Sequence, residues 1–224
     1  MAIHMTNFLE HSYEAKPQTY YTNPRTDFVD LLPISTSAAI LELGCGDGAT
    51  GALALKNGKC GTYVGLEMFA PMAERALKVL TTVHIGNVEN MQLPYEPACF
   101  DVLILSEVLE HLVDPHAVLG RLSRLLRPGA VVFASSPNVC HWRNILALCV
   151  GRFEYTESGM MDRTHLRWFT PSSFAAMFQS AGVEVDLVTP LNHLRRRERW
   201  LRRLFGRRFD AIWFYQINLR GHRS

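Results

Sequence analysis

The sequence predicts an α/β fold in which a doubly wound, mostly parallel sheet carries helices on both faces. Apolar runs of strand length alternate with amphipathic segments along the chain, which is the order of strand–helix–strand units. The runs are continuously apolar rather than alternating, and this pattern is typical of strands that are buried on both faces. Ligands of such sheets bind at the carboxyl ends of the strands, so the residues that follow each strand are the first candidates for a site.

The apolar runs give the order of the elements. Seven strands are expected, at residues 39–43, 62–66, 83–85, 102–105, 131–134, 183–188 and 211–219. Residues 142–150 are predicted to form a short amphipathic helix, and residues 151–170 a mixed polar and aromatic loop of the kind that often builds substrate sites. Pro171 begins a further helix, which Gly182 ends.

Composition places the chain among ordinary globular proteins, since 48% of its 224 residues are hydrophobic and 20% are charged. No apolar stretch reaches the roughly 18 residues of a membrane span, and the first residues lack a signal-peptide pattern, so we expect a cytoplasmic location. The five cysteines, an odd number without CxxC spacing, argue against a disulfide framework and a zinc knuckle. We expect a single domain with four parts: an N-terminal helical lid (1–36), a cofactor-binding core (37–136), an acceptor-site insertion (137–170) and a C-terminal part with a helix, strands and a basic helix (171–224).

A glycine-rich turn follows the first predicted strand, in the sequence ILELGCGDG at residues 40–48. Its glycines let the backbone turn sharply and approach a nucleotide-like ligand closely. The short pattern also fits the GxGxxG/A fingerprint of dinucleotide dehydrogenases. However, Glu42 and Asp47 put negative charge where a pyrophosphate would lie, and they would instead attract a ligand with an ammonium and a sulfonium group. Glu67 ends the second strand, in the position from which a carboxylate accepts hydrogen bonds from ribose hydroxyls.

These segments resemble the class I S-adenosylmethionine-dependent methyltransferases, because LELGCGDG, YVGLE, IGNV, FDVLILSEVLEHL and LLRPGAVV occur in that family's order and spacing. The resemblance implies a Rossmann-like sheet of seven strands whose last strand is antiparallel, and S-adenosyl-L-methionine as the cofactor. It also implies the residues of a cofactor site, with Gly44, Gly46 and Asp47 at the methionine part, Glu67 at the ribose, Met68 and Val88 at the adenine faces, and Asn87 at the adenine amino group. Glu42, from the charge argument, and Ser106 complete the expected cofactor site.

Two features of that cofactor site leave alternatives open. Asn87 stands where an acidic residue is frequent, but its amide oxygen can still accept a hydrogen bond from the adenine amino group. Tyr21 and Arg25 precede the first strand, where relatives place an aromatic and basic lid over the cofactor carboxylate. The same residues would also fit a surface helix with core aromatics.

Methyl transfer to a hydroxyl usually needs a base, and histidine is the first candidate because its ordinary pKa lies near neutrality. His111 lies just past the fourth strand, in the segment SEVLEH. Glu107, Glu110 and His111 resemble the metal-binding ExxEH cluster of ubiquinone-biosynthesis O-methyltransferases, and one helical turn would bring Glu107 and His111 onto one face. The segment therefore predicts a Mg²⁺ site, a direct base or a positioning role, and of these we favour a site without metal.

His165, in the loop segment GMMDRTHLRWFT, is the first choice for the base. Asp162 could orient its ring, while Arg163 or Arg167 could hold an anionic acceptor, with Trp142 as a further acceptor contact. Alternatively, Asp162 and Arg163 brace the loop and His165 is a satisfied core histidine. The segment resembles the DRTHLRFFT motif of bacterial polysaccharide-associated methyltransferases. That resemblance implies O-methylation of a sugar or glycan hydroxyl.

Two other functions compete with sugar methylation. A small-molecule methyltransferase could instead act on a phenol, carboxylate or amine. The stretch PNVCHWRN at residues 137–144 resembles part of the methionine-biosynthesis MetW family, which implies a non-catalytic protein that acts with a partner.

The C-terminal part is strongly basic, since residues 191–224 contain 10 Arg against Glu198 and Asp210. We expect an amphipathic helix from Leu194 to Phe205, with apolar residues on one face and Arg around them. It could lie on an anionic membrane surface, hold an anionic glycan or bind nucleic acid, although no nucleic-acid motif accompanies it. In the simplest interpretation its apolar face covers the sheet and its Arg side chains are solvated. The oligomeric state cannot be read from the sequence.

Overall fold

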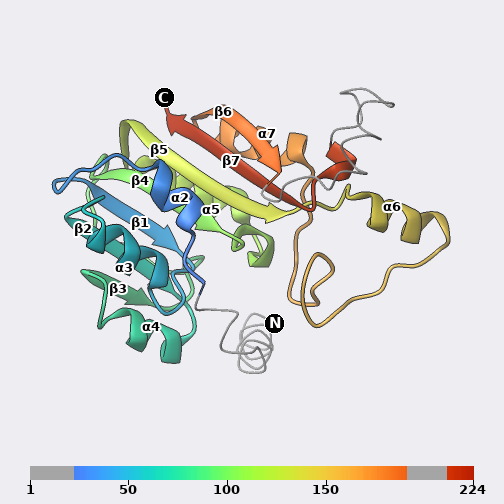
Figure 1. The fold of residues 1–224 in the computed structure, drawn as a ribbon, viewed down its shortest axis with the longest axis horizontal. Coiled ribbons are helices and arrows are strands. Elements are labelled where there is room, and N and C mark those ends of the chain that lie inside the picture. Colours follow the sequence, from blue (N-terminus) through green and yellow to red (C-terminus); the bar gives the residue numbers. More distant parts are fainter. Residues whose placement is uncertain (1–22, 191–210) are drawn as a thin grey trace. The chain divides into compact units, whose positions relative to one another are not determined.

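The computed structural model describes residues 23–190 and 211–224. Its strands form one seven-stranded sheet in the order β3-β2-β1-β4-β5-β7-β6 (Figure 1). Strand β7 runs antiparallel to both β5 and β6, whereas β1, β2, β3 and β4 pair in parallel. The predicted fold class, a doubly wound and mostly parallel sheet with an antiparallel last strand, is confirmed.

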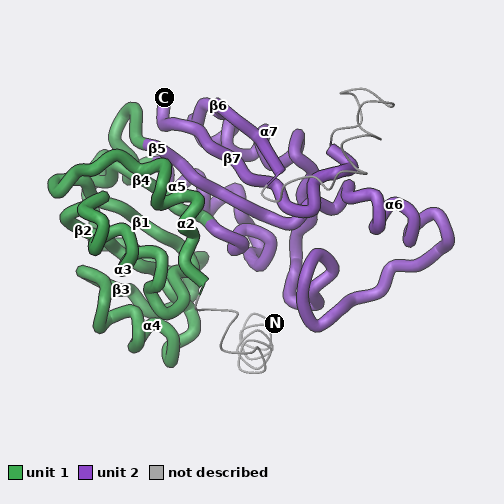
Figure 2. The backbone as a smooth tube through the Cα atoms, in the orientation of Figure 1, with its two compact units in different colours: residues 1–105, 124–130 green, residues 106–123, 131–224 purple. Residues whose placement is uncertain are grey.

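The chain divides into two compact units, which Figure 2 distinguishes by colour. The first unit comprises the described residues up to Leu105 together with Arg124–Ala130, and the second comprises Ser106–Ser123 and the described residues from Val131 onwards. Strand β5 (Leu126–Pro137) contributes residues to both units. Whether the chain acts as a single domain remains a prediction.

The first unit is built around β1 (Ala39–Leu43), which pairs in parallel with β2 (Thr62–Glu67) and β4 (Phe100–Ser106). Strand β3 (Thr82–Ile85) extends this sheet beyond β2. β1 and β2 are mostly apolar and bury consecutive residues, so they bury side chains on both faces, and Glu42 is the buried charged exception on β1. The core includes Ile40, Leu41, Tyr63 and Leu66, none of which exposes any measurable surface.

Three helices pack in the first unit: α2 (Thr26–Leu31), α3 (Ala49–Lys56) and α4 (Ala70–Ala76). Helix α3 packs against β2, and α4 packs against β2 and β3. The turn after β1 also lies close to β2, because β2 has a glycine at the point of contact. A Cβ atom at Gly65 of β2 would lie 2.5 Å from the sulfur of Cys45, so the turn after β1 can rest on β2 only if residue 65 has no side chain.

The second unit contains the short 3₁₀ helix η2 (Leu109–His111), α6 (Trp142–Cys149), α7 (Pro171–Ser180), β6 (Val183–Pro190) and β7 (Gln216–Arg223), with most of α5 (Pro115–Arg124). Helix α7 packs against β6 and buries Phe174 and Phe178, whose ring centroids lie 5.0 Å apart. It begins with a capping box, in which Thr170 accepts from the backbone N–H of Ser173. Gly182 follows the helix with φ of 76°, in agreement with the predicted end.

The last strand differs from the prediction. It was expected at residues 211–219, but β7 is Gln216–Arg223, and residues 211–213 form a 3₁₀ turn instead. Asn138 explains the difference, because its side-chain amide donates hydrogen bonds to the carbonyls of Ala211 and Phe214. These carbonyls are therefore held by a side chain and not by a neighbouring strand.

The cysteines and the lengths of the helices bear on two further expectations. All five cysteines are free, with Cys45 and Cys60 buried, Cys99 and Cys140 half-buried and Cys149 exposed. Burial raises the pKa of the Cys60 thiol to about 11, so this thiol stays protonated at neutral pH. Among the described helices, none combines the length and the apolar character that a membrane crossing requires.

Candidate active site

The glycine-rich turn lies at the end of β1, in the first unit. Gly44, Gly46 and Gly48 have φ of 74°, 55° and 84°, values that residues with side chains rarely adopt. The backbone N–H groups of Gly44 and Cys45 donate to the carbonyl of Leu66, and that of Gly46 donates to Glu67 Oε2 at 2.8 Å. The turn is thus fixed against the carboxyl end of β2, as expected for a ligand-binding edge.

Two carboxylates lie beside this turn. Glu42 is buried on β1 and accepts a hydrogen bond from the Tyr63 hydroxyl at 2.8 Å. Burial raises the pKa of Glu42 to about 7, although the bond from Tyr63 and the positive charge of Arg25 oppose the rise. Glu67 accepts from the backbone N–H groups of Gly46 and Phe69, and burial raises its pKa as well.

The carboxylates at this turn fit S-adenosyl-L-methionine better than a dinucleotide. Glu42, Glu67 and Asp47 surround the turn with groups that are anionic when ionised, which suits an ammonium and a sulfonium and repels a pyrophosphate. A cation bound there would favour the ionised form of Glu42 and lower its raised pKa. Asp47 also accepts from the backbone N–H of Ala49, where α3 begins.

The other residues implied for the cofactor site follow strand ends. Met68 is half-buried after β2, and Val88 is buried after β3. Asn87 Oδ1 accepts from the backbone N–H of Glu89 at 2.8 Å, and its second lone pair could still accept from an adenine amino group. Ser106, in the second unit, has its hydroxyl 3.4 Å from that of Ser135. Their contacts with a cofactor stay predictions.

The lid prediction can be followed only at Arg25, because Tyr21 lies outside the described residues. The Arg25 guanidinium forms an ion pair of 2.8 Å with Asp27 and lies 3.6 Å from the centre of the Phe28 ring. Its charge also acts on Glu42. Arg25 is therefore close enough to influence the turn electrostatically, while its role as a lid stays a prediction.

In the second unit, the segment after β4 does not form the expected helical turn. Glu107 adopts a positive φ of 49° and precedes the 3₁₀ helix η2, which contains only Leu109–His111. The prediction that one helical turn aligns Glu107 with His111 is wrong for this reason. Glu107 Oε2 instead accepts a hydrogen bond from Gln216 of β7 at 3.0 Å.

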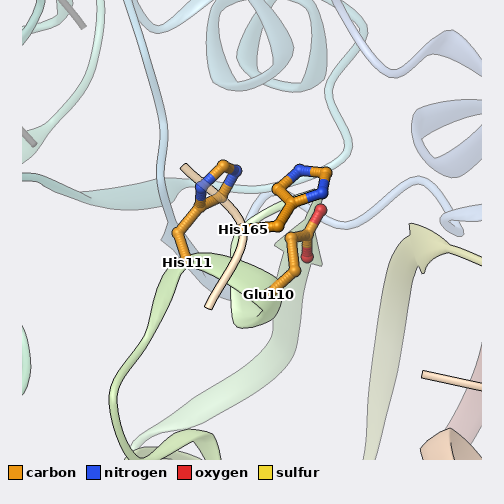
Figure 3. A group of neighbouring side chains, drawn as sticks. All are labelled: Glu110, His111 and His165. Carbon is orange, nitrogen blue, oxygen red and sulfur yellow. The ribbon is translucent and has the colours of Figure 1, made fainter. Parts of the chain in front are cut away.

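The structure brings together two segments that the sequence offered as separate candidates. The backbone N–H groups of Leu166 and Arg167 donate to the carbonyl of Glu110, at 2.8 and 3.0 Å, and so hold the 159–170 loop against η2. As a result the rings of His111 and His165 lie edge to face with centroids 4.8 Å apart. Figure 3 shows these two rings converging with the Glu110 side chain. We call these three buried residues the His–His–Glu cluster.

Hydrogen bonds fix the tautomer of both histidine rings. Nδ1 of His111 lies 3.2 Å from the carbonyl of Thr164, and Nδ1 of His165 lies 3.1 Å from the carbonyl of Met160. A carbonyl can only accept, so each Nδ1 carries a hydrogen. In the neutral ring the lone pair is then on Nε2, where it can accept a proton or bind a metal ion.

Glu110 is the acidic member of the cluster, and only 1% of it is exposed. Ser136 donates to Glu110 Oε2 at 3.1 Å, whereas Oε1 has no hydrogen-bond partner among the described residues. Burial, together with the negative charge of Glu107, holds the pKa of Glu110 well above its ordinary range.

The polar residues around His165 mostly brace the loop. Asp162 Oδ1 accepts from both the backbone N–H and the hydroxyl of Thr164, at 2.9 and 2.8 Å. Arg163 is half-exposed and forms a 2.7 Å ion pair with Glu157, and the Arg167 guanidinium donates to the carbonyl of Val113. These contacts match the bracing alternative of the sequence analysis, and acceptor binding by either arginine stays a prediction.

Trp142 is the last implied acceptor contact. It begins α6, with the guanidinium of Arg143 5.4 Å from its ring centre, and its role also stays a prediction. The predicted arginine-rich helix at Leu194–Phe205 lies outside the described residues.

Sequence reasoning missed the residues that hold the candidate groups in place: Tyr63 at Glu42, Ser136 at Glu110 and Gln216 at Glu107. A signal existed for Ser136, because Ser135 and Ser136 are polar residues at the carboxyl end of the fifth strand. For Tyr63 no chemical signal existed, since an aromatic residue inside an apolar strand is indistinguishable from core.

Comparisons with known proteins agree with this geometry. A family model described as a methyltransferase domain matches residues 16–188. A ubiquinone biosynthesis O-methyltransferase of Pseudomonas putida strain GB-1 is 30% identical over 190 residues, which cover 80% of this chain and 79% of the relative. One of Xylella fastidiosa strain M23 is 28% identical over 180 residues, covering 76% of this chain and 71% of the relative.

Solved structures share the fold at lower identity. A SAM-dependent methyltransferase from Archaeoglobus fulgidus superposes with a TM-score of 0.67 at 12% identity, covering 97% of this chain and 99% of that one. One from Mesorhizobium loti gives a TM-score of 0.62 at 16% identity, covering 88% and 96%. The sheet order, the glycine-rich turn with its carboxylates and the family match together show that this chain belongs to the methyltransferase domain family and is an S-adenosylmethionine-dependent methyltransferase.

Proposed function

We propose that this methyltransferase acts on a hydroxyl oxygen of a small molecule, and that the His–His–Glu cluster activates this hydroxyl. The observation that carries the proposal is the pair of buried imidazoles of His111 and His165, each held by a carbonyl at Nδ1 so that Nε2 bears the lone pair. The relatives that are named O-methyltransferases support oxygen as the acceptor atom.

In the proposed mechanism, the bound cofactor supplies an activated methyl carbon for in-line displacement. The carboxylates of Glu42 and Glu67 would hold its cationic and ribose parts at the glycine-rich turn. Nε2 of His165 would accept the proton of the acceptor hydroxyl while its oxygen takes the methyl group; the methyl–sulfur bond would break and S-adenosylhomocysteine would leave. The bond from Nδ1 to the Met160 carbonyl keeps this ring in the tautomer that can do so.

The carboxyl ends of β1 and β4 lie at one edge of the sheet. Leu43 of β1 is in register with Leu105 of β4, and the strands are parallel, so the chain leaves both at the same edge of the sheet. The glycine-rich turn follows the first of these strands, and the segment that contains His111 follows the second. Ligands of doubly wound sheets bind at this edge.

Two acceptor classes remain within this proposal. A sugar or glycan hydroxyl is supported by the resemblance of residues 162–170 to the motif of polysaccharide-associated methyltransferases. A non-sugar small molecule is supported by the ubiquinone biosynthesis relatives. A MetW-like partner protein without turnover is the remaining alternative, and the relatives named as enzymes favour catalysis over it.

The first experiment is calorimetric titration of the purified chain with S-adenosylmethionine and S-adenosylhomocysteine, with NAD as a negative control. Micromolar binding of the first two would justify an acceptor screen with nucleotide-linked sugars, lipid-linked sugars, phenols, carboxylates and amines, followed by mass spectrometry of the products. A methylated hydroxyl would support the proposal. Products methylated only at nitrogen, or cofactor binding without turnover on any acceptor, would contradict it.

A further inference from the structure

We propose that three aromatic residues of the loop at residues 151–170, Phe153, Tyr155 and Trp168, bind an uncharged sugar ring of the methyl acceptor. We call these residues the aromatic triad. Their ring centroids lie 5.7, 6.0 and 6.2 Å apart, so the three side chains form one contiguous group. The inference deepens the proposed function, on which it rests for the claim that the bound sugar is the molecule that is methylated.

The triad is an apolar surface that is open to solvent. Phe153 is 51% exposed, Tyr155 is 48% exposed and Trp168 is half-buried. Single apolar side chains on a protein surface need no explanation, but apolar side chains that are exposed as a group mark binding sites. Tyrosine and tryptophan suit such sites because each combines a large flat ring with one polar group. The triad therefore fits a ligand that has an apolar face.

The indole N–H of Trp168 is a second, independent observation. Nε1 is buried and has no hydrogen-bond acceptor among the residues that the structure describes. Buried donors normally have an acceptor, because burial without one loses the hydrogen bond to water. Phe153 and Tyr155 lie beside this ring and are exposed, so rotation of either side chain would give a ligand access to the indole. An oxygen atom of the ligand would then accept from Nε1.

A sugar ring combines the two properties that the triad requires. The C–H groups of a pyranose form an apolar face that can stack on aromatic rings, and its hydroxyl oxygens accept hydrogen bonds from a donor such as Nε1. A hydrocarbon chain has the apolar surface but no acceptor. An inorganic anion has acceptors but no apolar face.

The charges around the triad favour an uncharged ligand. Residues 152–168 are formally neutral, with three arginines and three acids: Arg152, Arg163, Arg167, Glu154, Glu157 and Asp162. Glu154 is exposed and stands between Phe153 and Tyr155 in the sequence, so its carboxylate would repel an anionic sugar or an anionic lipid surface. The ion pair between Arg163 and Glu157 also neutralises one of the positive charges that could attract an anion.

Backbone hydrogen bonds hold both parts of the triad in place. The residue before Trp168 donates its N–H to the carbonyl of Glu110 at 3.0 Å, and the residue after it accepts at its carbonyl from the N–H of Val139 at 3.0 Å. The residue after Tyr155 donates its N–H to the carbonyl of Met161 at 2.8 Å. A binding site whose backbone is fixed in advance loses less conformational entropy when the ligand arrives.

The triad belongs to the same loop as the proposed base. Trp168 follows His165 by three residues, so their Cα atoms lie at most about 11 Å apart. A short oligosaccharide is long enough to span this distance. We therefore expect one sugar ring to rest on the triad while a hydroxyl of a neighbouring ring lies near His165.

The test uses the full chain with isotope-labelled tryptophan. The probes are the uncharged methyl glycosides of glucose, galactose, mannose and rhamnose, together with disaccharides of these sugars. The chain has four tryptophans, so four indole N–H signals are expected in the NMR spectrum, and Trp168→Phe identifies the signal of residue 168. Saccharide binding should shift this signal. Saturation-transfer NMR should show that the C–H protons of the sugar ring contact the protein.

Three variants separate ring stacking from hydrogen bonding. Trp168→Phe keeps an aromatic ring but removes the N–H, and it should weaken saccharide binding by roughly 3- to 10-fold. Trp168→Ala and Tyr155→Ala remove stacking surface and should each weaken it by about 10-fold. Leu187→Ala, at an exposed apolar residue of β6, is the matched control and should leave binding unchanged. Circular dichroism and thermal unfolding would establish that each variant is folded.

The inference would be overturned if no saccharide of the panel bound the folded chain, or if Trp168→Ala left saccharide binding intact. It would also be overturned if anionic lipid vesicles shifted the indole signal of residue 168 and no saccharide did. Saccharide binding that depends on the triad, without methylation of any hydroxyl, would contradict only the proposed function. Methylation of a non-sugar hydroxyl by a chain that binds no saccharide would contradict sugar binding at the triad and leave the proposed function standing.

Discussion

The imidazole of His165 meets the imidazole of His111 edge to face, with ring centroids 4.8 Å apart. In the sequence these residues belong to separate candidate sites, one after the fourth strand and one on a long loop. Two hydrogen bonds from the loop backbone to the carbonyl of Glu110 join the sites into one buried cluster. The histidines should accordingly act together rather than as alternatives.

Replacement of His165 should slow chemistry without changing cofactor affinity. His165→Gln removes the proposed proton acceptor, so kcat should fall by roughly 10²- to 10⁴-fold. His111→Gln should also lower kcat. The increase in activation free energy in the double variant should be smaller than the sum of the increases in the two single variants, because contacting residues do not act independently. Single-turnover kinetics would measure these losses, and calorimetry the cofactor affinity.

His116→Gln, on the exposed surface of α5, is the matched control for this series and should keep wild-type turnover. Unchanged kcat in His165→Gln, once the acceptor is known, would remove His165 from the mechanism.

Stability should depend on pH through Glu42. Burial raises its pKa from the usual 4.5 to about 7 in the folded state, so the folded chain holds this proton more tightly than the unfolded chain. The resulting stabilisation is fully present below pH 4.5 and is lost as pH rises to about 7. It should amount to a few kcal/mol, on the order of 1.4 kcal/mol for each pKa unit.

Glu42→Gln cannot ionise, and its carbonyl oxygen can still accept from Tyr63. The difference in unfolding free energy between wild type and this variant should therefore shrink or reverse in favour of the variant between pH 4.5 and 8. Denaturant titrations at several pH values would measure it. A difference that is constant with pH would show that Glu42 titrates normally.

Affinity for S-adenosylmethionine should fall with decreasing pH below about 7, since protonation removes the negative charge of Glu42. The expected slope approaches tenfold per pH unit if binding requires the ionised carboxylate. Calorimetry from pH 5.5 to 8 would measure it. In Glu42→Gln the affinity should be lower and the slope reduced, and an unaltered slope would assign the effect to another group.

Gly48 should not tolerate a side chain. Its φ of 84° is unfavourable for alanine, and a Cβ atom there would lie 2.9 Å from Val79 and 3.1 Å from the backbone of Ala76. Gly48→Ala should therefore destabilise the chain by about 1–2 kcal/mol from the backbone alone, with a further cost from the contacts. Chemical denaturation would measure the loss.

Gly120 on α5 provides the opposite case, because a Cβ atom there would have no neighbour within 4 Å. Gly120→Ala should stabilise the chain by up to about 1 kcal/mol, as alanine favours the helix. Similar effects of the two substitutions would contradict the distinction drawn from their surroundings.

Local sequence determined the parallel sheet and its ligand-binding turn. The runs at residues 39–43 and 62–66 are apolar at their buried positions except for Glu42, and such nearly continuous apolar runs are typical of strands in a sheet covered on both faces. The turn that follows β1 needs positive φ, and glycine at positions 44, 46 and 48 supplies it. Both features could be predicted from short stretches of chain, although β2 also holds the turn through Leu66 and Glu67.

Tertiary structure decided which side chains meet. Sequence spacing suggested that Glu107 and His111 share a helical face, but a positive φ at Glu107 and the amide of Gln216 on β7 place Glu107 elsewhere. The last strand begins at Gln216 and not at residue 211, because the Asn138 amide donates hydrogen bonds to the carbonyls of Ala211 and Phe214. The pairing of His111 with His165 likewise depends on backbone hydrogen bonds between segments far apart in the chain. Such contacts are fixed only when the register of the strands and the path of the loop are fixed together, and periodicity along the sequence carries no information about either.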